Sequence, residues 1–138
     1  MVELEGSNDS GINLSVQRVV VTGATGFLGG HVLKQLRTTG AAVIAVLDRN
    51  RSSRHDSSTQ SIETLYFDQP NQLVATVRSA RPDYVIHLHA VVTTERSTAA
   101  VRRTLEVNLL PSLDLMVACG EMKVKRLSSW APAKSLVP

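Results

Sequence analysis

The sequence predicts an α/β fold in which a doubly wound parallel sheet is covered by helices on both faces. Strand and helix signals alternate along the chain, and the strand signals are short, unbroken apolar runs typical of buried parallel strands. A glycine-rich turn also joins the first strand to the first helix. The chain has 138 residues, of which 43% are hydrophobic, so it can bury the core of one such domain.

The order of these signals defines the expected elements. Apolar runs predict four strands, at residues 16–21, 43–47, 64–67 and 84–88. Helical spacing of apolar residues predicts three helices, at residues 27–38, 71–80 and 97–122. Because crossover connections between parallel strands are right-handed, the expected strand order is 3-2-1-4, with a stub of a fifth strand.

The last predicted helix carries two further signals. Pro111 lies inside it and, lacking an N–H group, is expected to kink or divide the helix. Apolar residues also recur on one side of this helix, namely Val101, Leu105, Leu109, Leu113, Met116 and Val117.

The two ends of the chain differ in composition from its middle. Residues 1–15 are rich in glycine, serine, asparagine and aspartate and are predicted to form a flexible tail. Residues 16–127 are expected to form the folded domain, and the polar, proline-bearing residues 128–138 an aberrant tail. The polar loop at 48–61 is long enough to be functional or disordered.

Composition excludes several classes of function. The net charge of +3 is too small to favour nucleic acid, and no apolar run approaches the roughly 18–20 residues that cross a membrane. Cys119 is the single cysteine, so no internal disulfide can form and a cytoplasmic location is expected. His87 and His89 alternate along a predicted strand without an acid cluster, so no metal site is expected.

The stretch VVVTGATGFLGG, residues 19–30, places glycines where a phosphate-binding turn needs them. Gly23 permits the tight turn, Gly26 lets backbone N–H groups approach a pyrophosphate, and Gly29 lets the helix pack closely. The positive end of the helix dipole favours an anion there, and the Thr25 hydroxyl is an additional donor. The alternative is a glycine-rich turn that holds no ligand.

An acid at the end of the second strand indicates which dinucleotide would bind. Asp48 follows Gly23 by 25 residues, and a carboxylate at this point accepts hydrogen bonds from the adenosine ribose, which favours NAD. Arginines at 49, 51 and 54 leave NADP open, because a guanidinium near the 2′ position would favour a phosphate. These arginines could equally belong to a solvated loop.

Several segments in order resemble the extended short-chain dehydrogenase/reductase family, the NAD-dependent epimerases and dehydratases that act mostly on nucleotide sugars. The segments are TGATGFLG, YFDQ, RPDYVIHLHA and VNLLPSLDLMVAC, and the resemblance spans roughly residues 17–127. It implies a Rossmann-type domain, here only its N-terminal part, with the cofactor across the carboxyl ends of strands one, two and four. A nucleotide-sugar substrate is expected only in an intact enzyme.

The resemblance also implies roles for individual residues. The backbones of Phe27 and Leu28 would line the pyrophosphate, and Asp68 would contact the adenine amino group, with Gln69 beside it. Strand four would supply cofactor contacts through Leu88, His89 and Ala90, with His89 replacing the usual small residue and narrowing the nicotinamide side. Asn108 is expected to point inward from the Val101–Leu105 side of its helix and to belong to the cofactor-binding site. The alternatives stay open: a turn residue at Asp68, a packed histidine at His87 or His89, and a solvent-facing Asn108.

The residue pair that performs hydride chemistry in this family is absent from the sequence. Family members carry a tyrosine followed four residues later by a lysine, which lowers the pKa of the phenol. Tyr66 and Tyr84 are followed at that spacing by Pro70 and Leu88. We therefore assign no catalytic residue and expect no turnover. The functions left open are the cofactor-binding portion of an oxidoreductase, a silent dinucleotide-binding or sensing module, and a non-functional truncated product.

The end of the sequence departs from the family. Ser128 and Ser129 arrive about two residues early for the family's strand five, so neither is assigned a role. A shift of one base can reread Leu127 onward as an apolar strand and a small-residue turn, so a frameshift and a genuine end both stay open. Because the family's second half would be missing, the last strand and the long helix are expected to expose apolar surface that favours self-association.

Overall fold

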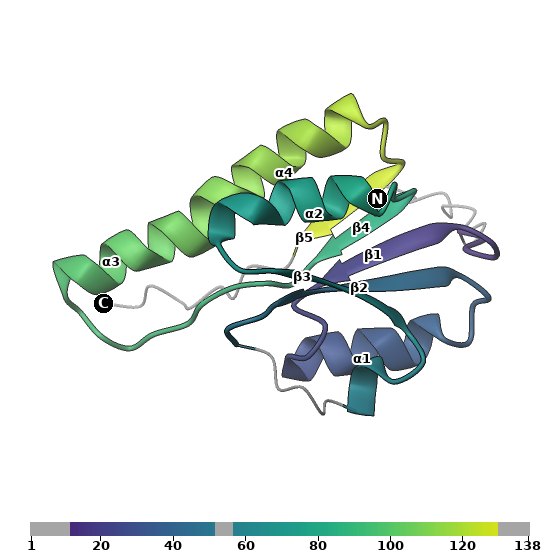
Figure 1. Cartoon of the computed structure of the whole chain (residues 1–138), viewed down its shortest axis with the longest axis horizontal. Coiled ribbons are helices and arrows are strands. Elements are labelled where there is room, and N and C mark those ends of the chain that lie inside the picture. The colour runs from purple at the N-terminus through teal and green to yellow at the C-terminus, as the bar shows by residue number, and fades with distance from the viewer. Residues whose placement is uncertain (1–11, 52–56, 130–138) are drawn as a thin grey trace, which may run out of the picture.

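Five parallel strands form the sheet of this computed structural model, which describes residues 12–51 and 57–129 (Figure 1). The strands are β1 (Arg18–Thr22), β2 (Ala42–Asp48), β3 (Glu63–Phe67), β4 (Tyr84–His87) and β5 (Arg126–Ser129). They lie side by side in the order β3-β2-β1-β4-β5. This confirms the predicted order of the first four strands and the fifth strand at the edge.

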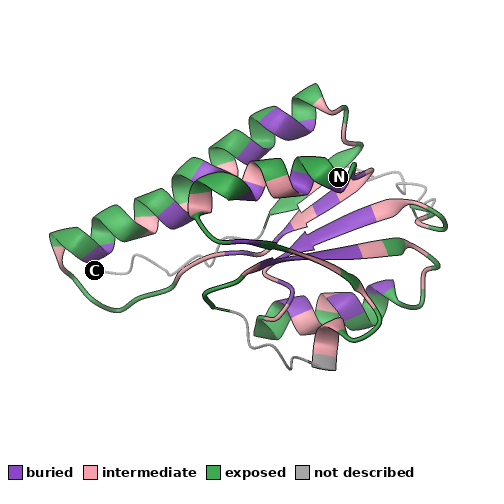
Figure 2. Ribbon diagram, in the orientation of Figure 1, coloured by how far each residue is buried: buried purple, intermediate pink, exposed green. Residues whose placement is uncertain are grey.

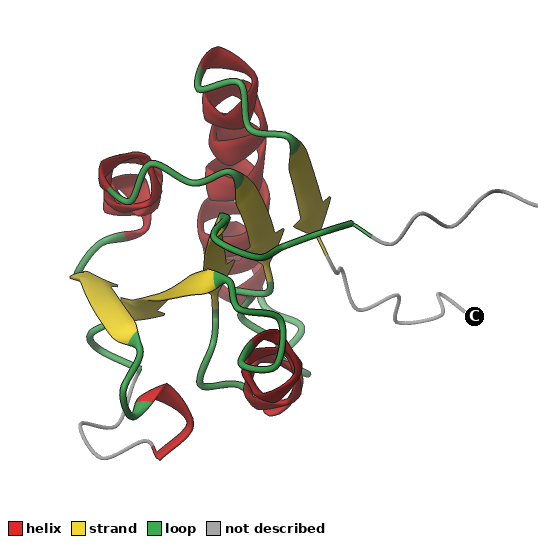
Figure 3. Cartoon of the chain, turned by 90° about the vertical axis from the view of Figure 1, so that its right-hand side faces the viewer, coloured by secondary structure: helices red, strands yellow, loops and turns green. Residues whose placement is uncertain are grey.

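Helices cover both faces of this sheet. The helical elements are α1 (Phe27–Leu36), η1 (Ser57–Thr59), η2 (Pro70–Gln72), α2 (Leu73–Ser79), α3 (Thr98–Thr104), η3 (Leu105–Leu109) and α4 (Leu110–Glu121). Figures 1 and 3 show α1 on one face and α2 with the long α3–α4 run on the other. The doubly wound arrangement predicted from the alternating signals is therefore confirmed.

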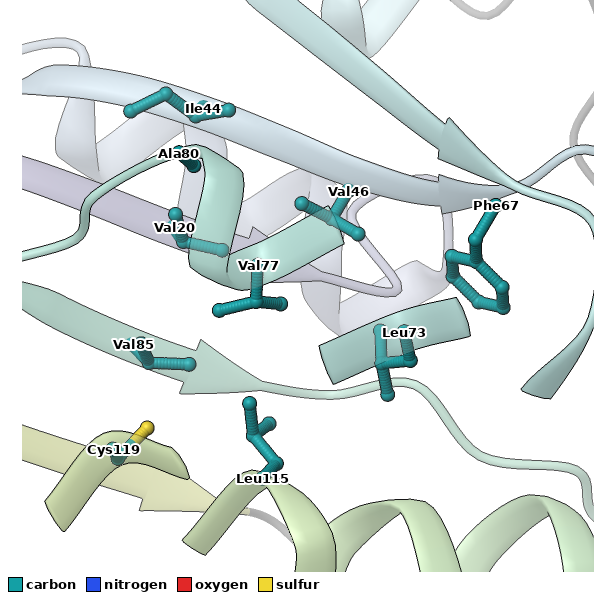
Figure 4. Close-up of a cluster of buried hydrophobic side chains, with 10 residues drawn as sticks. All are labelled: Val20, Ile44, Val46, Phe67, Leu73, Val77, Ala80, Val85, Leu115 and Cys119. Carbon is teal, nitrogen blue, oxygen red and sulfur yellow. The ribbon is translucent and has the colours of Figure 1, made fainter. Parts of the chain in front are cut away.

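The core has two layers because successive strand side chains point to opposite faces. On the α2 and α4 face, Val20 of β1 packs with Phe67, Leu73, Val77 and Leu115 (Figure 4). On the α1 face, the core consists of Val19, Val21, Ala24, Leu33, Leu36, Ala45 and Leu47. The central strands are the most buried part of the molecule, as Figure 2 shows.

The long helical run is not divided at Pro111, where a kink or a division was expected. Instead of dividing the helix, Pro111 follows a π-helical turn, η3, and occupies the first turn of α4. The N–H group of Leu110 donates to the carbonyl of Leu105, five residues back. The wider π-helical turn adjusts the backbone just before the residue that has no N–H group, so the run continues from α3 into α4.

The apolar side predicted for this helix faces solvent. Its residues are 46–65% exposed: Val101, Leu105, Leu109, Leu113, Met116 and Val117. The side that packs on the sheet instead carries Ala100, Val107, Pro111, Leu115, Ala118 and Cys119. Spacing alone could not identify the buried side, because both sides of this helix are apolar.

The described residues reach slightly past the expected end of the domain. β5 includes Ser128 and Ser129, the first two residues of the segment predicted as an aberrant tail, and both are exposed. The other residues of that segment, 130–138, lie outside the described part of the chain, as do residues 1–11 of the predicted N-terminal tail and Arg54 of the polar loop.

Candidate functional site

The turn after β1 depends on two glycines. Gly23 has a φ of +66°, and a Cβ there would lie 2.7 Å from the backbone nitrogen of His89. A Cβ on Gly29 would lie 2.7 Å from the Cα of Ala24, inside the same turn. Gly23 therefore lets the turn approach the end of β4, and Gly29 lets α1 pack against the turn, which are the structural roles that the spacing predicts.

The N-terminus of α1 opens at this turn. Gly26 precedes the helix in an extended conformation, with φ −70° and ψ 169°, and no side chain caps the helix. The bond from the Gly30 N–H to the Gly26 carbonyl, at 2.9 Å, begins the helical pattern. The first turn of α1 contains no acidic residue. The N–H groups of this turn and the helix dipole therefore favour an anion from outside the helix.

A half-open hollow of about 210 Å³ lies beside this helix end. It is lined from the ends of three strands: after β1 by Gly23, Thr25 and Gly26, at β2 by Leu47, Asp48 and Arg51, and after β4 by Leu88, His89 and Ala90. Seven of the predicted site residues thus lie together. Asp48 and Gly26 line one hollow, so a single ligand can contact both.

Arg51 lines the hollow, although the sequence left open whether it would contact a ligand or belong to a solvated loop. Its Nη1 donates to the carbonyl of Ala90 at 3.2 Å, so the guanidinium connects the ends of β2 and β4. Asp48 begins the same turn, with its Oδ1 accepting from the N–H of Asn50 at 2.9 Å. Leu47, the strand residue before Asp48, also lines the hollow and was predicted only as core. The sequence signal that could have indicated this role of Leu47 is its position directly before Asp48.

Arg49, Asp68 and Gln69 do not line this hollow. The Nε of Arg49 donates to Oδ1 of Asp68 at 2.9 Å, and the guanidinium lies over the ring of Tyr66. The backbone N–H groups of Asp68 and Gln69 both donate to Oε1 of Gln72, at 2.9 and 3.0 Å. In this structure Asp68 and Gln69 therefore form the connection between β3 and η2, and Arg49, which follows β2, is paired with that connection.

Phe27, Leu28 and Gly29 also lie outside the lining of the hollow. All three belong to the first turn of α1, where the ring of Phe27 is 88% exposed. The resemblance implies backbone contacts for Phe27 and Leu28, and their backbone lies at the helix end that borders the hollow. Any role of theirs is therefore through N–H groups rather than side chains.

Asn108 anchors the segment after β4 instead of lining the hollow. Its Oδ1 accepts from the N–H of Val91 and its Nδ2 donates to the carbonyl of Val91, both at 2.7 Å. The Asn108 side chain points inward, as expected. It does so from the side of the helix that also carries Ser112, whereas Val101 and Leu105 face solvent. Both polar atoms of Asn108 thus hold the backbone of the residue after Ala90. A cofactor contact of Asn108 stays a prediction.

His87 is the centre of a closed hydrogen-bond network. The hydroxyl of Ser112 donates to the carbonyl of Asn108, so it accepts from Nε2 of His87 at 2.9 Å. Nδ1 of His87 then accepts from the Thr22 hydroxyl at 2.7 Å, while Oγ1 of Thr22 accepts from the N–H groups of Leu88 and His89. Burial, and secondarily His89, lower the pKa of His87 to about 4. His87 is therefore a neutral, packed histidine.

His89 is buried but incompletely paired. Its ring meets the edge of Phe67 at a centroid distance of 5.3 Å, at the end of β3. Within the described residues its Nε2 has no hydrogen-bond partner. Burial and the charge of Arg51 lower the pKa of His89, and Asp48 opposes them. The ring thus lies toward β3, the side of the sheet where the resemblance places the adenine. A narrowing of the nicotinamide side by His89 stays a prediction.

This geometry defines a class of protein. A glycine turn, a helix N-terminus and an acid meet where the strand order reverses beside β1, the point at which doubly wound sheets bind dinucleotides. The family model for the NAD dependent epimerase/dehydratase family matches residues 19–131, and the chain belongs to this family. A comparison with characterised proteins gives no significant match.

Solved structures of the same fold support the assignment. An epimerase from Methanothermobacter thermautotrophicus is 27% identical, with a TM-score of 0.72 over 84% of this chain and 35% of that chain. The Thermus thermophilus UDP-glucose 4-epimerase, solved with NAD, is 28% identical, with a TM-score of 0.68 over 80% of this chain and 36% of that chain. The chain therefore spans about a third of the length of these proteins.

A third structure extends the comparison to a sugar-bound enzyme. UDP-glucose 4-epimerase from Thermotoga maritima, solved with UDP-glucose, is 28% identical, with a TM-score of 0.65 over 81% of this chain and 37% of that chain.

The described residues show no sign of a membrane span or of a metal site. They contain no helix long and apolar enough to cross a membrane, and no group of three or more potential metal ligands.

Proposed function

We propose that this chain is the NAD-binding portion of a nucleotide-sugar epimerase or dehydratase. The observation that carries the proposal is the hollow shared by the α1 N-terminus and Asp48 at the ends of β1, β2 and β4. The residues fit a dinucleotide: the α1 N-terminus has no side-chain cap and no acidic residue in its first turn, and His89 presents a buried nitrogen without a partner among the described residues. The Thermus thermophilus relative, solved with NAD, adds support.

The residues divide the work of holding NAD. The first-turn N–H groups of α1 would bind the pyrophosphate, and Asp48 would accept hydrogen bonds from the adenosine ribose. Leu88 and Ala90 would pack against the ligand from the end of β4. When bound, the nicotinamide supplies the hydride chemistry. Asn108 acts indirectly, because it fixes Val91, the residue next to Ala90.

The choice between NAD and NADP depends on two opposed charges. The Asp48 carboxylate would repel a 2′-phosphate, whereas the Arg51 guanidinium would attract one. We propose a preference for NAD, because the Arg51 side chain already donates to the carbonyl of Ala90, whereas Asp48 lines the hollow at the end of β2. Of the other arginines, Arg49 is paired with Asp68 away from the hollow.

Calorimetric titration of the full chain with NAD and NADP tests the proposal. We expect NAD to bind more tightly, and Asp48→Ser to weaken NAD binding by about 10-fold or more, since a hydrogen bond to a charged group is worth about 1.5–3 kcal/mol. Asp114→Asn, at an exposed position of α4, is the matched control and should bind NAD like the wild type. Binding of neither dinucleotide by the wild type would overturn the proposal.

We also propose that this chain alone does not turn over a nucleotide sugar, since its sequence lacks the Tyr-x-x-x-Lys pair. The Thermotoga maritima relative was solved with UDP-glucose, which makes UDP-glucose the natural probe. Incubation with NAD and UDP-glucose, followed by chromatography of the sugar nucleotides, should show no epimerised product. Product formed only after a second protein is added would favour a binding module that acts through a partner.

The exposed side of the long helix supports self-association. Val101, Leu105, Leu109, Leu113 and Val117 lie four residues apart and are symmetric about Leu109. An antiparallel second copy would pair Val101 with Val117, Leu105 with Leu113, and Leu109 with itself. A two-fold axis produces this kind of self-complementary contact. We propose that a second copy of the chain covers this side.

Sedimentation equilibrium tests the proposed dimer. The wild type should sediment as a dimer at micromolar concentration, and Leu109→Glu should sediment as a monomer, because the charge would lie next to its own copy on the two-fold axis. Val92→Glu places the same charge at an exposed apolar position outside the helix and should leave the dimer intact. A monomeric wild type, or a dimeric Leu109→Glu, would contradict the proposal.

A further inference from the structure

His89 presents a buried polar atom with no partner in the described part of the chain. The residue is 8% exposed, and its Nε2 makes no hydrogen bond there. Buried polar groups in folded proteins almost always have a partner, and an unpaired one costs about 1–3 kcal/mol. His89 also lines the hollow assigned above to the dinucleotide, so a bound ligand can reach the region of its ring.

The surroundings of His89 fix the ring without satisfying Nε2. Phe67 holds the ring edge-on, and the backbone N–H of His89 donates to Oγ1 of Thr22 at 3.2 Å. The charged and titratable groups around the ring are Arg51, Asp48 and His87. Two of these groups have hydrogen-bond partners other than His89: the Arg51 guanidinium donates to the carbonyl of Ala90, and the Asp48 carboxylate accepts from the N–H of Asn50.

The position of the ring indicates which part of a dinucleotide it faces. Phe67 ends β3 and Asp48 ends β2, so His89 is turned toward the side of the sheet where Asp48 would hold the adenosine ribose. The helix end that would hold the pyrophosphate borders the same hollow, after β1. A neutral imidazole can donate or accept, so it can pair with a ring nitrogen or a hydroxyl.

We propose that Nε2 of His89 forms a hydrogen bond with the adenosine half of the bound dinucleotide, which makes His89 a specificity-determining residue of this chain. The inference rests on the proposed NAD-binding function. It gives the side chain of His89 a role at a position where the family resemblance leads one to expect a small residue and contacts through the backbone.

Titration of His89→Ala and His89→Gln tests the contact. We expect His89→Ala to weaken binding of NAD and of ADP-ribose by the same factor, about 5- to 30-fold, because one hydrogen bond of the adenosine half is lost. His89→Gln keeps a donor and an acceptor and should recover part of the loss. Unchanged affinity in His89→Ala, or a loss seen with NAD but not with ADP-ribose, would overturn the inference.

A second measurement does not depend on the variants folding. In ¹⁵N-labelled wild-type chain, addition of ADP-ribose should move the Nε2 resonance of His89. The ring of His87, whose nitrogens are both occupied by Thr22 and Ser112, should move much less. Equal shifts at both rings, or none at His89 in a saturated complex, would contradict the inference. If the wild type binds neither ligand, the proposed function itself fails.

Discussion

Gly23 shows how one absent Cβ shapes the site. Its φ of +66° and the 2.7 Å approach to the nitrogen of His89 leave no room for a side chain, and the obstructing atoms are backbone. We expect Gly23→Ala to lower the free energy of unfolding by roughly 1–3 kcal/mol, because it combines a strained backbone with a clash. Urea unfolding followed by circular dichroism would measure the loss.

Gly30 provides the matched control for this substitution. It lies in α1, and a Cβ there would meet nothing within 4 Å. Gly30→Ala should therefore raise the free energy of unfolding by about 0.5–1 kcal/mol, since alanine favours a helix over glycine. If both substitutions changed stability in the same direction, the turn geometry described for Gly23 would be wrong.

His87 links stability to pH. Its pKa is lowered to about 4 from 6.5 by burial first and His89 second, so the unfolded chain binds a proton between these values while the folded chain does not. The free energy of unfolding should fall as pH falls from about 6.5 to about 4, by up to roughly 3 kcal/mol, and then level off for this group. The lowered pKa of His89 acts in the same direction.

Unfolding by urea at pH 7 and pH 5 measures this dependence. In His87→Gln the difference between the two pH values should shrink, because glutamine does not titrate, and the remainder would come mainly from His89. His31→Gln, at an exposed position of α1, should keep the wild-type difference. A His87→Gln variant with an undiminished difference would show that the Thr22–His87–Ser112 network does not hold His87 neutral.

At the level of elements, local sequence predicted the strands better than the long helix. The strands are unbroken apolar runs between turn residues, and each was located within about two residues at its ends. The helix from α3 to α4 is apolar on two sides, and its four-residue spacing marked the side that lies in solvent. The π-helical turn before Pro111 depends on backbone bonding that residue patterns do not encode.

Asn108 joins two elements that are distant in the sequence. Both polar atoms of its side chain bond the backbone of Val91. Asn108→Ala would leave the N–H and carbonyl of Val91 unpaired, so we expect a loss of roughly 1–3 kcal/mol in the free energy of unfolding. Asn108→Asp keeps the acceptor and should lose less. Amide hydrogen exchange at Val91 should accelerate in the alanine variant, and unchanged exchange would contradict the anchoring role.

At the scale of the whole molecule, the sequence predicted which residues meet at the site where their meeting follows from the ends of neighbouring strands. Gly26 lies in the turn after β1 and Asp48 ends β2, the neighbouring parallel strand, so their meeting follows from topology. Side-chain pairing could not be predicted in the same way. Arg49 pairs with Asp68 and Arg51 with Ala90, although both arginines follow the same strand. Their separation depends on the path of the turn after Asp48, which composition does not determine.

Binding of NAD should stabilise the molecule as a whole. The proposed ligand would contact the ends of β1, β2 and β4, and it can bind in this way only when the sheet is folded. At a concentration of NAD 100 times its Kd, the free energy of unfolding should rise by about 2.7 kcal/mol, and the midpoint of thermal unfolding by roughly 8 °C.

Thermal unfolding with increasing NAD would measure this rise, and the same series with inorganic phosphate provides the control. In Asp48→Ser the midpoint should rise less at each NAD concentration, because the carboxylate that would hold the ribose is gone. Phosphate alone would contact only the α1 N-terminus and should raise the midpoint little. An equal rise with phosphate and NAD would mean that the helix end binds anions without the contribution of β2, and the three strand ends would not form one site.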